Sequence, residues 1–286
     1  AQASLMCCLL VLVRPLLAQT EAQTGRQTQL PANALEAVTV TGNPLNATDL
    51  IAPAANLSGQ ELLLKRKASL GETLDGLPGV SSSYFGPVAS RPTVRGLDGD
   101  RIRILNNGGA AADASGLSFD HAVPIDPLTM ERVEVLRGPG ALQYGGSAIG
   151  GVVNVINNRI QPDATFDAQG GVTGRAELRG GGSDSERAAS ALLETGTDQF
   201  SLHVDAFERH TADVRVPKDL PCDPAGSGTP SVARRLCNSA SHSQGGAVGG
   251  TAYFDRGYLG VSVETFKTDY GSVAEDTVTI RMKQTR

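Results

Sequence analysis

The amino-acid sequence predicts an α+β domain up to about residue 162, followed by a series of antiparallel β-strands. Before Pro162, short helix signals and short strand signals are mixed. After Pro162, segments of about ten residues alternate polar with apolar side chains, which is typical of strands. A third observation is the stretch 132–158, RVEVLRGPGALQYGGSAIGGVVNVINN, which places six glycines between two strand-like runs.

The first residues have the character of an export signal. The apolar run Leu5–Val13 is too short to cross a membrane as a helix, and a small-residue cleavage site follows near Ala18. We expect residues 1–18 to be a signal peptide. A buried apolar element is the alternative, because Arg14 interrupts the pattern. The polar segment 19–34 is expected to be a flexible leader.

The domain before Pro162 begins with a helix and continues with short strands. Helix signals occupy residues 58–80, where Ser69 and Glu72 form a capping box at the start of a helically spaced leucine series. Asp126-Pro127 is suited to cap and start a short helical turn. The expected strands are 92–96, 101–105, 131–136 and 151–156, and the expected helical turns are 127–130 and 139–143.

The strands after Pro162 are joined by links of two kinds. The links GTD and DR are tight, whereas GGSDS is longer and 211–243 is very long. Alternating strands of this length, with short links on one side and long links on the other, are typical of an outer-membrane β-barrel. A soluble β-sandwich is the alternative, because aromatic residues make up only 4% of the chain and such barrels carry aromatic girdles.

Composition and residue spacing exclude some classes of partner and of activity. The net charge is -5 and no Lys/Arg-rich stripe appears, which argues against a nucleic-acid partner. No nucleophile–base pattern is present, so the sequence predicts neither an enzyme nor a catalytic cofactor. In an exported chain Cys222 and Cys237 would remain after the signal is removed, and a disulfide is expected between them. A metal-binding pair is the alternative, although the spacing lacks the close C-x2-4-C pattern.

The stretch 131–156, ERVEVLRGPGALQYGGSAIGGVVNVI, resembles the plug signature of TonB-dependent outer-membrane receptors. In that signature a strand is followed by R-G-P, a Y-G turn and G-G-V-V-N-V-I. The resemblance implies a plug domain at 43–162 and the first strands of a barrel of about 22 strands at 163–286. It also implies an outer-membrane location in a Gram-negative bacterium, contact with membrane lipid, and import driven by the periplasmic TonB protein.

The same resemblance assigns a role to the segment 35–42, LEAVTVTG. A short exposed strand after a flexible leader is suited to pairing with the sheet edge of another protein. The segment is similar to the TonB box of the family, so TonB is expected to bind Glu36, Ala37, Val38, Thr39 and Val40.

The length of the chain limits how much of a barrel it can form. Residues 163–286 leave room for roughly five or six strands of ~10 residues, too few to close the barrel. The chain is therefore expected to be an N-terminal fragment that does not transport alone. The glycines of 132–158 are expected to allow tight turns and close approach in a plug that must fit the barrel and still move.

The candidate cargo site is the pair Asp120 and His121 in the loop segment 116–127, GLSFDHAVPIDP. A carboxylate beside a neutral imidazole suits a borderline ion such as zinc. With 91–108, this segment resembles the zinc-import (ZnuD-type) branch of the family, where an Asp-His pair on the plug supplies zinc ligands. A solvated Asp-His dipeptide is the alternative from spacing alone.

Two further sets of residues are candidates. His210 and His242 flank the long link 211–243 and could add a secondary zinc site, with a solvated, disulfide-stapled loop as the alternative. Arg95 and Arg137 are expected to pair with acidic residues of the barrel, since guanidinium groups suit bidentate carboxylate pairing. His203 is expected to be an ordinary residue of the barrel wall.

The function expected from the sequence is zinc import across the outer membrane, with Zn²⁺ as the transported ligand. A receptor of the same fold for haem or a ferric siderophore is the first alternative, in which His121 could serve as a haem ligand. The second alternative is a non-transporting plug fragment that acts as a binding module.

Overall fold

The computed structural model describes residues 54–111, 114–223 and 226–286. The expected signal peptide, the leader and the TonB-box-like segment 35–42 lie outside the described residues. Among the described residues, no helix has the length and apolar character needed to cross a membrane.

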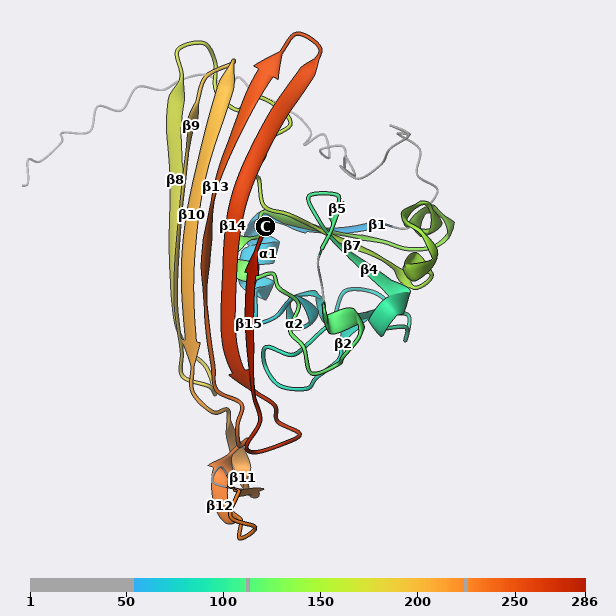
Figure 1. Cartoon of the computed structure of the whole chain (residues 1–286), viewed down its shortest axis with the longest axis vertical. Coiled ribbons are helices and arrows are strands. Elements are labelled where there is room, and N and C mark those ends of the chain that lie inside the picture. The colour runs from blue at the N-terminus through green and yellow to red at the C-terminus, as the bar shows by residue number, and fades with distance from the viewer. Residues whose placement is uncertain (1–53, 112–113, 224–225) are drawn as a thin grey trace, which may run out of the picture. The chain divides into compact units, whose positions relative to one another are not determined.

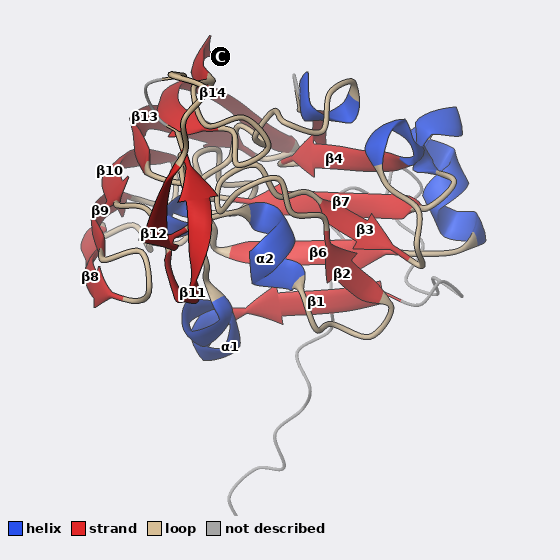
Figure 2. Ribbon diagram, turned by 90° about the horizontal axis from the view of Figure 1, so that it is seen from below, coloured by secondary structure: helices blue, strands red, loops and turns tan. Residues whose placement is uncertain are grey.

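The N-terminal domain is built on a five-stranded sheet with the order β1-β6-β7-β4-β5. The central strand β7 pairs antiparallel with β6 and parallel with β4. All six residues of β7 are buried, because helices and turns cover the sheet (Figure 2). The strands are β1 (Ala54–Ser58), β4 (Ile102–Asn106), β5 (Gly109–Ala110), β6 (Arg132–Leu136) and β7 (Gly151–Ile156).

The helix signals at 58–80 give two short helices rather than one. Helix α1 spans Gly59–Lys65 and α2 spans Leu70–Leu74. Ser69 is extended and its side chain accepts a hydrogen bond from the Glu72 amide at 3.2 Å, as the capping box predicts. Helix α1 ends at its C-cap Arg66, which leaves the helical conformation with a ψ of 126°, and Ser69 then starts α2 as a separate helix.

The remaining elements of this domain are short. Strand β2 (Val80–Ser82) pairs with β3 (Pro92–Val94), which ends earlier than expected because Arg95 turns the chain at a φ of 52°. Asp126 caps the turn that follows it, as expected, by accepting from the Leu128 amide at 2.9 Å. The 3₁₀ turns are η1 (Gly99–Arg101), η2 (Ala114–Gly116), η3 (Pro127–Thr129), η4 (Pro139–Tyr144) and η5 (Gly146–Ala148).

The glycines of 132–158 allow tight turns and close contact between neighbouring backbone segments, as expected. Gly138 has a φ of 84° and Gly151 a φ of 146°. A Cβ atom added to Gly151 would lie 2.9 Å from the carbonyl oxygen of Leu136. A side chain at Gly151 would therefore separate β7 from β6.

The second half of the chain forms a six-stranded antiparallel sheet with the order β15-β14-β13-β10-β9-β8 (Figure 1). The two edge strands are not paired with each other, so the sheet is open. A two-stranded hairpin, β11 (Arg215–Cys222) with β12 (Ser231–Arg235), lies within the long link. The sheet strands are β8 (Gly171–Gly181), β9 (Glu186–Gly196), β10 (Phe200–Thr211), β13 (Ser241–Phe254), β14 (Gly257–Gly271) and β15 (Thr279–Thr285).

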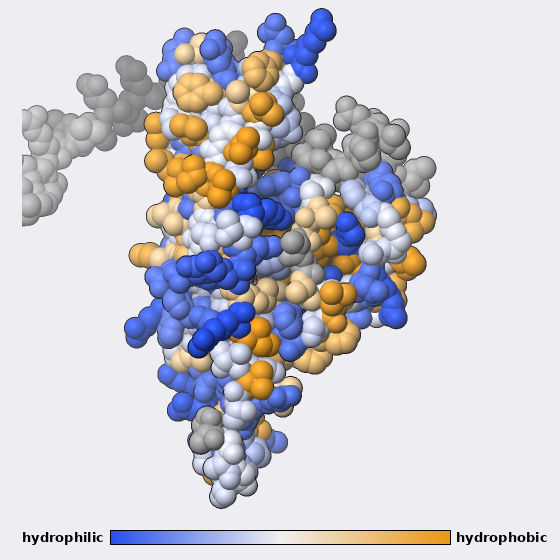
Figure 3. Space-filling view, viewed as in Figure 1, coloured by the Kyte–Doolittle hydropathy of each residue, from blue (hydrophilic) through white to orange (hydrophobic). Residues whose placement is uncertain are grey.

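The exposed face of this sheet is apolar and its buried face is polar, the reverse of what is usual in a soluble protein. Along β10 the residues alternate strictly between exposed and buried. Phe200, Leu202 and Val204 are on the exposed face, whereas His203 and Asp205 are buried against the N-terminal domain. Figure 3 shows apolar side chains gathered on the outer surface of the strands. An apolar outer face and a polar inner face are typical of a barrel wall in lipid rather than of a soluble sandwich.

Candidate functional site

The N-terminal domain is held against the inner face of the sheet by buried ion pairs. Arg159, just after β7, binds Asp205 of β10 in a bidentate manner, with Nε–Oδ2 at 2.8 Å and Nη2–Oδ1 at 2.9 Å. Its Nη1 also donates to Glu264 of β14. Arg159 and Asp205 are both less than one-tenth exposed. A buried guanidinium with two acidic partners fixes the point where the chain passes from the domain to the sheet.

The contact around Arg159 is close enough to require glycine on the sheet. A Cβ atom added to Gly249 of β13 would lie 1.9 Å from the Arg159 carbonyl oxygen. A Cβ atom at Gly260 of β14 would lie 2.3 Å from a methyl carbon of Ile160. The backbone of residues 159–160 therefore rests directly on the strands.

In a second buried ion pair the arginine comes from the sheet and the carboxylate from the N-terminal domain. Arg209 of β10 is fully buried and binds Asp126 of the domain, with Nη2–Oδ1 at 3.0 Å and Nε–Oδ2 at 3.2 Å. Arg209 also donates to Glu186 of β9. Because Asp126 caps the Leu128 turn as well, this carboxylate links local structure in the domain to the sheet.

His203 lies beside the Arg159 pair and connects two carboxylates. Its Nε2 is 3.0 Å from Asp205 Oδ2, and its Nδ1 is 3.0 Å from Glu194 Oε1. The ring satisfies both acceptors only when both nitrogens carry hydrogen. His203 therefore lies in the wall of the sheet, as expected, but it also contacts two carboxylates, which the sequence did not predict. This network could have been predicted from the alternation of β10. Its inward-facing positions include three titratable residues, His203, Asp205 and Arg209.

The arginines chosen from the sequence are not the ones that make these contacts. Arg137 donates from Nη1 to the carbonyl oxygen of Pro78, within the N-terminal domain. Arg95 lies in the turn after β3, and its amide donates to the Gly79 oxygen at 2.9 Å. The reason is position: both residues follow strands whose ends turn back into the domain. Arg66 instead binds Glu177 of β8 at 2.5 Å.

Asp120 and His121 lie side by side in a loop that β14 holds. His121 Nδ1 is 2.9 Å from Asp120 Oδ1, and both side chains are more than one-third exposed. The Tyr270 hydroxyl donates to the Asp120 carbonyl oxygen at 2.8 Å and accepts from the Ala122 amide at 2.8 Å. The Ser118 hydroxyl and His121 lower the pKa of the Asp120 carboxyl below its usual range. The carboxylate is therefore ionised and accessible.

Asp120 and His121 offer one carboxylate and one imidazole, which are side-chain types that bind zinc in proteins. Within the described residues, the only group of three potential metal ligands whose donor atoms lie within 4.8 Å of one another is Cys222, Cys237 and Asp276. A disulfide joins these two cysteines, with a Cα–Cα distance of 5.4 Å, so their sulfurs are not free as thiolate ligands.

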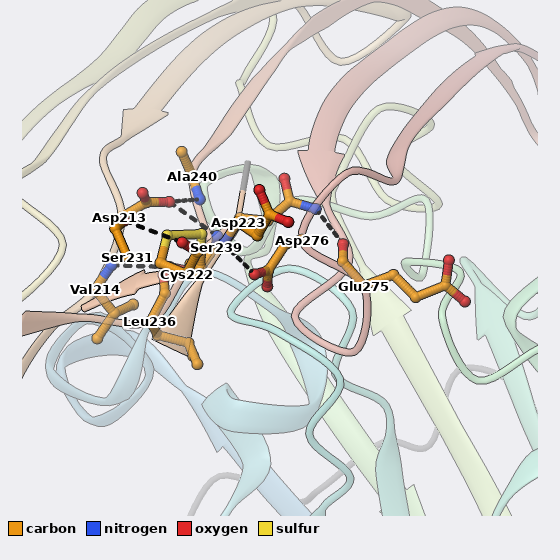
Figure 4. Close-up of a disulfide and its surroundings, with 12 residues drawn as sticks. Asp213, Val214, Cys222, Asp223, Ser231, Leu236, Ser239, Ala240, Glu275 and Asp276 are labelled. Atoms are coloured by element: carbon orange, nitrogen blue, oxygen red, sulfur yellow. Dashed lines mark hydrogen bonds between the residues drawn. A yellow bond between two sulfur atoms is a disulfide. The ribbon is translucent and has the colours of Figure 1, made fainter. Parts of the chain in front are cut away.

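The disulfide closes the β11–β12 hairpin, and hydrogen bonds attach it to neighbouring links (Figure 4). Asp276 accepts from the Asp223 amide at 2.6 Å, and Asp213 accepts from the amides of Ser239 and Ala240 at 2.9 and 3.0 Å. The carboxylates of this link are thus used to order its backbone. His210 and His242 lie at its base as cross-strand partners on β10 and β13.

A polar cavity of about 720 Å³ lies between the N-terminal domain and the β8–β9 link. Lys67, Glu72 and Tyr84 line it from the domain, and Asp184 and Glu186 line it from the sheet. Burial raises the pKa of Glu72 to about 7, even though Lys67 and the Ser69 hydroxyl oppose the shift. A cavity with these groups accepts a hydrated or chelated ion more readily than an apolar ligand.

Residues 46–152 match the family model described as the TonB-dependent Receptor Plug Domain. This region is a TonB-dependent receptor plug domain. The plug, followed by antiparallel strands in an open sheet, confirms the fold class expected from the sequence. The expected location in the outer membrane of a Gram-negative bacterium is confirmed as well.

The curated relatives are much longer than this chain. The vitamin B12 transporter BtuB of Photobacterium profundum is 34% identical over 171 residues, which cover 56% of this chain and 28% of the relative. The ferrioxamine receptor of Yersinia enterocolitica is 25% identical over 206 residues, covering 68% and 27%. The chain thus spans about a quarter of the length of these relatives, which by their names are transporters and receptors.

Solved structures share the fold of the plug and the strands. The copper transporter OprC has a TM-score of 0.60 at 19% identity, covering 77% of this chain and 31% of that one. The unliganded ferric citrate transporter FecA has a TM-score of 0.55 at 15% identity, covering 81% and 33%. At these identities the likeness concerns the fold alone.

Proposed function

We propose that this chain is the plug and the first barrel strands of a TonB-dependent receptor that imports zinc across the outer membrane. The observation that carries the transport part is the nature of the plug–sheet contact. Arg159–Asp205 and Arg209–Asp126 are buried, bidentate pairs rather than apolar packing. Such pairs define one position of the plug, yet their partners can be resolvated when the plug is displaced.

The zinc part rests on Asp120 and His121. Both side chains are exposed, adjacent and of ligand types that zinc uses. Tyr270, which holds their loop, lies near the end of β14 that leads into the link 272–278. That link is on the side of the long links, which in a barrel of this kind is the cell exterior. Cargo arriving from outside would meet this loop first.

Energy for release is proposed to come from the periplasmic TonB protein. TonB would bind the strand-like segment Glu36–Val40 and pull on the chain that leads into β1. Because β1 pairs with β6 at the edge of the five-stranded sheet, tension there reaches the plug sheet directly. The match of residues 46–152 to the TonB-dependent Receptor Plug Domain supports this partner.

Uptake of a chelated metal is the second candidate function. Its support is the naming of the relatives, which include a vitamin B12 transporter and a ferrioxamine receptor. The polar cavity of about 720 Å³ beside Glu72 would accept a larger ligand than a single ion. A receptor of this kind would bind the chelate and show no preference for free Zn²⁺.

Calorimetry on the detergent-solubilised complete receptor separates these candidates. Zinc chloride, ferrioxamine and cyanocobalamin are titrated into the wild type and into the Asp120→Ala/His121→Ala variant. We expect the variant to bind one zinc ion fewer than the wild type, since two ligands of that ion are lost. Asp219→Ala, an exposed residue paired with Arg234, is the control and should bind as the wild type does. An equal number of bound zinc ions in all three proteins would overturn the site.

A further inference from the structure

The outer face of the six-stranded sheet changes character along the strands. Strand pairing places Val204 in one transverse row with Leu193, Val248 and, one strand further, Val263. All four are exposed apolar side chains, as expected where lipid covers the wall. Moving along β10 toward the long link, the outward positions become Ala206, Glu208 and His210. The apolar band therefore ends before His210.

The row that contains His210 is polar across the sheet. His210 pairs with His242 of β13, and His242 pairs with Asp269 of β14. On the other side of His210 the register partner is Arg187 of β9. A row of titratable side chains beyond the apolar band lies in the headgroup or aqueous zone, where ions from the medium have access.

The two imidazoles are already close together. Their ring centres are 6.0 Å apart, with the planes at 63°. Two imidazoles bound to one tetrahedral ion at about 2.0–2.1 Å have ring centres roughly 5 Å apart. Directly opposed residues on neighbouring strands have Cβ atoms about 4.5–5.5 Å apart, so side-chain rotation alone can bring both rings onto one ion.

A carboxylate stands beside the pair. Glu208, two residues before His210 on the same face, has its Oε1 3.1 Å from His242 Nε2. Glu208 is well exposed, so no burial cost opposes its movement toward an ion. Two histidines and one carboxylate form a ligand set that zinc uses in sites with an open fourth position.

We propose that His210, His242 and Glu208 form a metal site for a borderline divalent ion, with Zn²⁺ as the best match, on the outer wall of the sheet at the edge of the apolar band. The site is separate from Asp120 and His121 and faces the opposite side of the sheet, so it does not rest on the proposed function. Metal bound there links β10 to β13 at the base of the long link and stabilises the end of that hairpin.

Neighbouring charged residues are expected to change the metal affinity of this site. Asp269, in register with His242, favours a bound cation, although it also lies 3.5 Å from Arg281. Arg187, in register with His210, opposes one. Replacing Arg187 with Gln is therefore expected to tighten metal binding severalfold, whereas Asp269→Asn is expected to weaken it.

The test uses protein purified from outer membranes in detergent, with zinc chloride as the probe. All variants carry Asp120→Ala/His121→Ala, so that the proposed cargo site cannot bind zinc. Zinc calorimetry at pH 7.5 is expected to show one ion bound in this background, and at least tenfold weaker binding after His210→Ala/His242→Ala. Gln244→Ala, a neighbouring position on the same face of β13, is the matched control and should leave binding unchanged.

Three outcomes decide the proposal. Loss of binding in the His210→Ala/His242→Ala variant, with Gln244→Ala normal, supports it. Unchanged binding in that variant, or the absence of a bound ion in the starting background, overturns it. Where the double variant fails to fold, Glu208→Gln and Arg187→Gln replace it, and they must shift the affinity in opposite directions.

Discussion

At the scale of single residues, polar groups form the contact between the plug and the sheet. Asp120 and His121 are proposed as ligands from their residue types, their place in a loop and the resemblance to the zinc-import branch of the family. Their support by Tyr270 was not visible in the sequence, because 148 positions separate Tyr270 from Ala122. The Arg159 and Arg209 pairs were missed for the same reason: a long-range ion pair leaves no local pattern.

Tyr270→Phe tests the support of the Asp120–His121 loop. The change removes the hydroxyl that accepts from the buried Ala122 amide and donates to the Asp120 oxygen. An unsatisfied buried donor costs about 1–3 kcal/mol. We expect the loop to loosen and zinc affinity to fall severalfold, as measured by calorimetry. An affinity equal to that of the wild type would show that Tyr270 does not position the ligands.

Glu72→Gln tests the pH dependence of the plug. Burial raises the pKa of Glu72 to about 7, whereas the unfolded chain has the ordinary value near 4.5. The folded protein therefore binds this proton more tightly than the unfolded chain does. The stability contribution is lost as pH rises from about 4.5 through 7.

Urea unfolding at pH 4, 6 and 8 measures this effect. Glu72→Gln cannot ionise, so its free energy of unfolding should fall less than that of the wild type between pH 4 and pH 8. The variant should be the more stable protein at pH 8. Parallel pH profiles for the two proteins would contradict the assignment.

At the scale of elements, the strands of the sheet were the most predictable part. Their alternating pattern predicted the series of antiparallel strands after Pro162 that the structure shows. Strand β15 and the β11–β12 hairpin were missed, because their pattern is short and the hairpin lies in what reads as a loop. The helix signals of 58–80 are divided between two helices, because the chain leaves the helical conformation at Arg66 and restarts at the Ser69 cap.

Gly249→Ala and its neighbour Gly250→Ala test the close contact between the plug exit and the sheet. A methyl group at Gly249 would meet the Arg159 oxygen at 1.9 Å, so the backbone must shift. At Gly250 the nearest atom is a flexible Leu202 methyl carbon at 3.3 Å. We expect Gly249→Ala to reduce the free energy of unfolding by about 1–3 kcal/mol and Gly250→Ala by under ~0.5 kcal/mol. Equal effects would indicate that Arg159 does not rest on β13.

At the scale of the whole molecule, the plug and the sheet are joined by charged groups that come from both sides. Arg159 extends from the plug to Asp205, and Arg209 extends from the sheet to Asp126. Plug residues and wall residues therefore depend on each other. Breaking a buried ion pair by removing one member costs up to about 3–5 kcal/mol. Each arginine keeps a second acidic partner, Glu264 for Arg159 and Glu186 for Arg209, when the aspartate is removed.

A double-mutant cycle on Arg209→Met and Asp126→Asn measures this coupling. Each single change is expected to raise the rate at which protease cleaves the plug in the detergent-solubilised receptor. The double variant should be less impaired than the sum of the two, with a coupling of about 0.5–3 kcal/mol in the free energy of unfolding. Additive effects would mean that the pair does not hold the plug to the wall.

The uptake of radioactive zinc by cells that express the complete receptor tests the central claim most directly. The account predicts zinc accumulation that requires TonB and that is lost in the Asp120→Ala/His121→Ala variant, while the variant reaches the outer membrane in normal amount. Accumulation of zinc that is independent of TonB, or TonB-dependent uptake of ferrioxamine or cobalamin with no uptake of zinc, would contradict it.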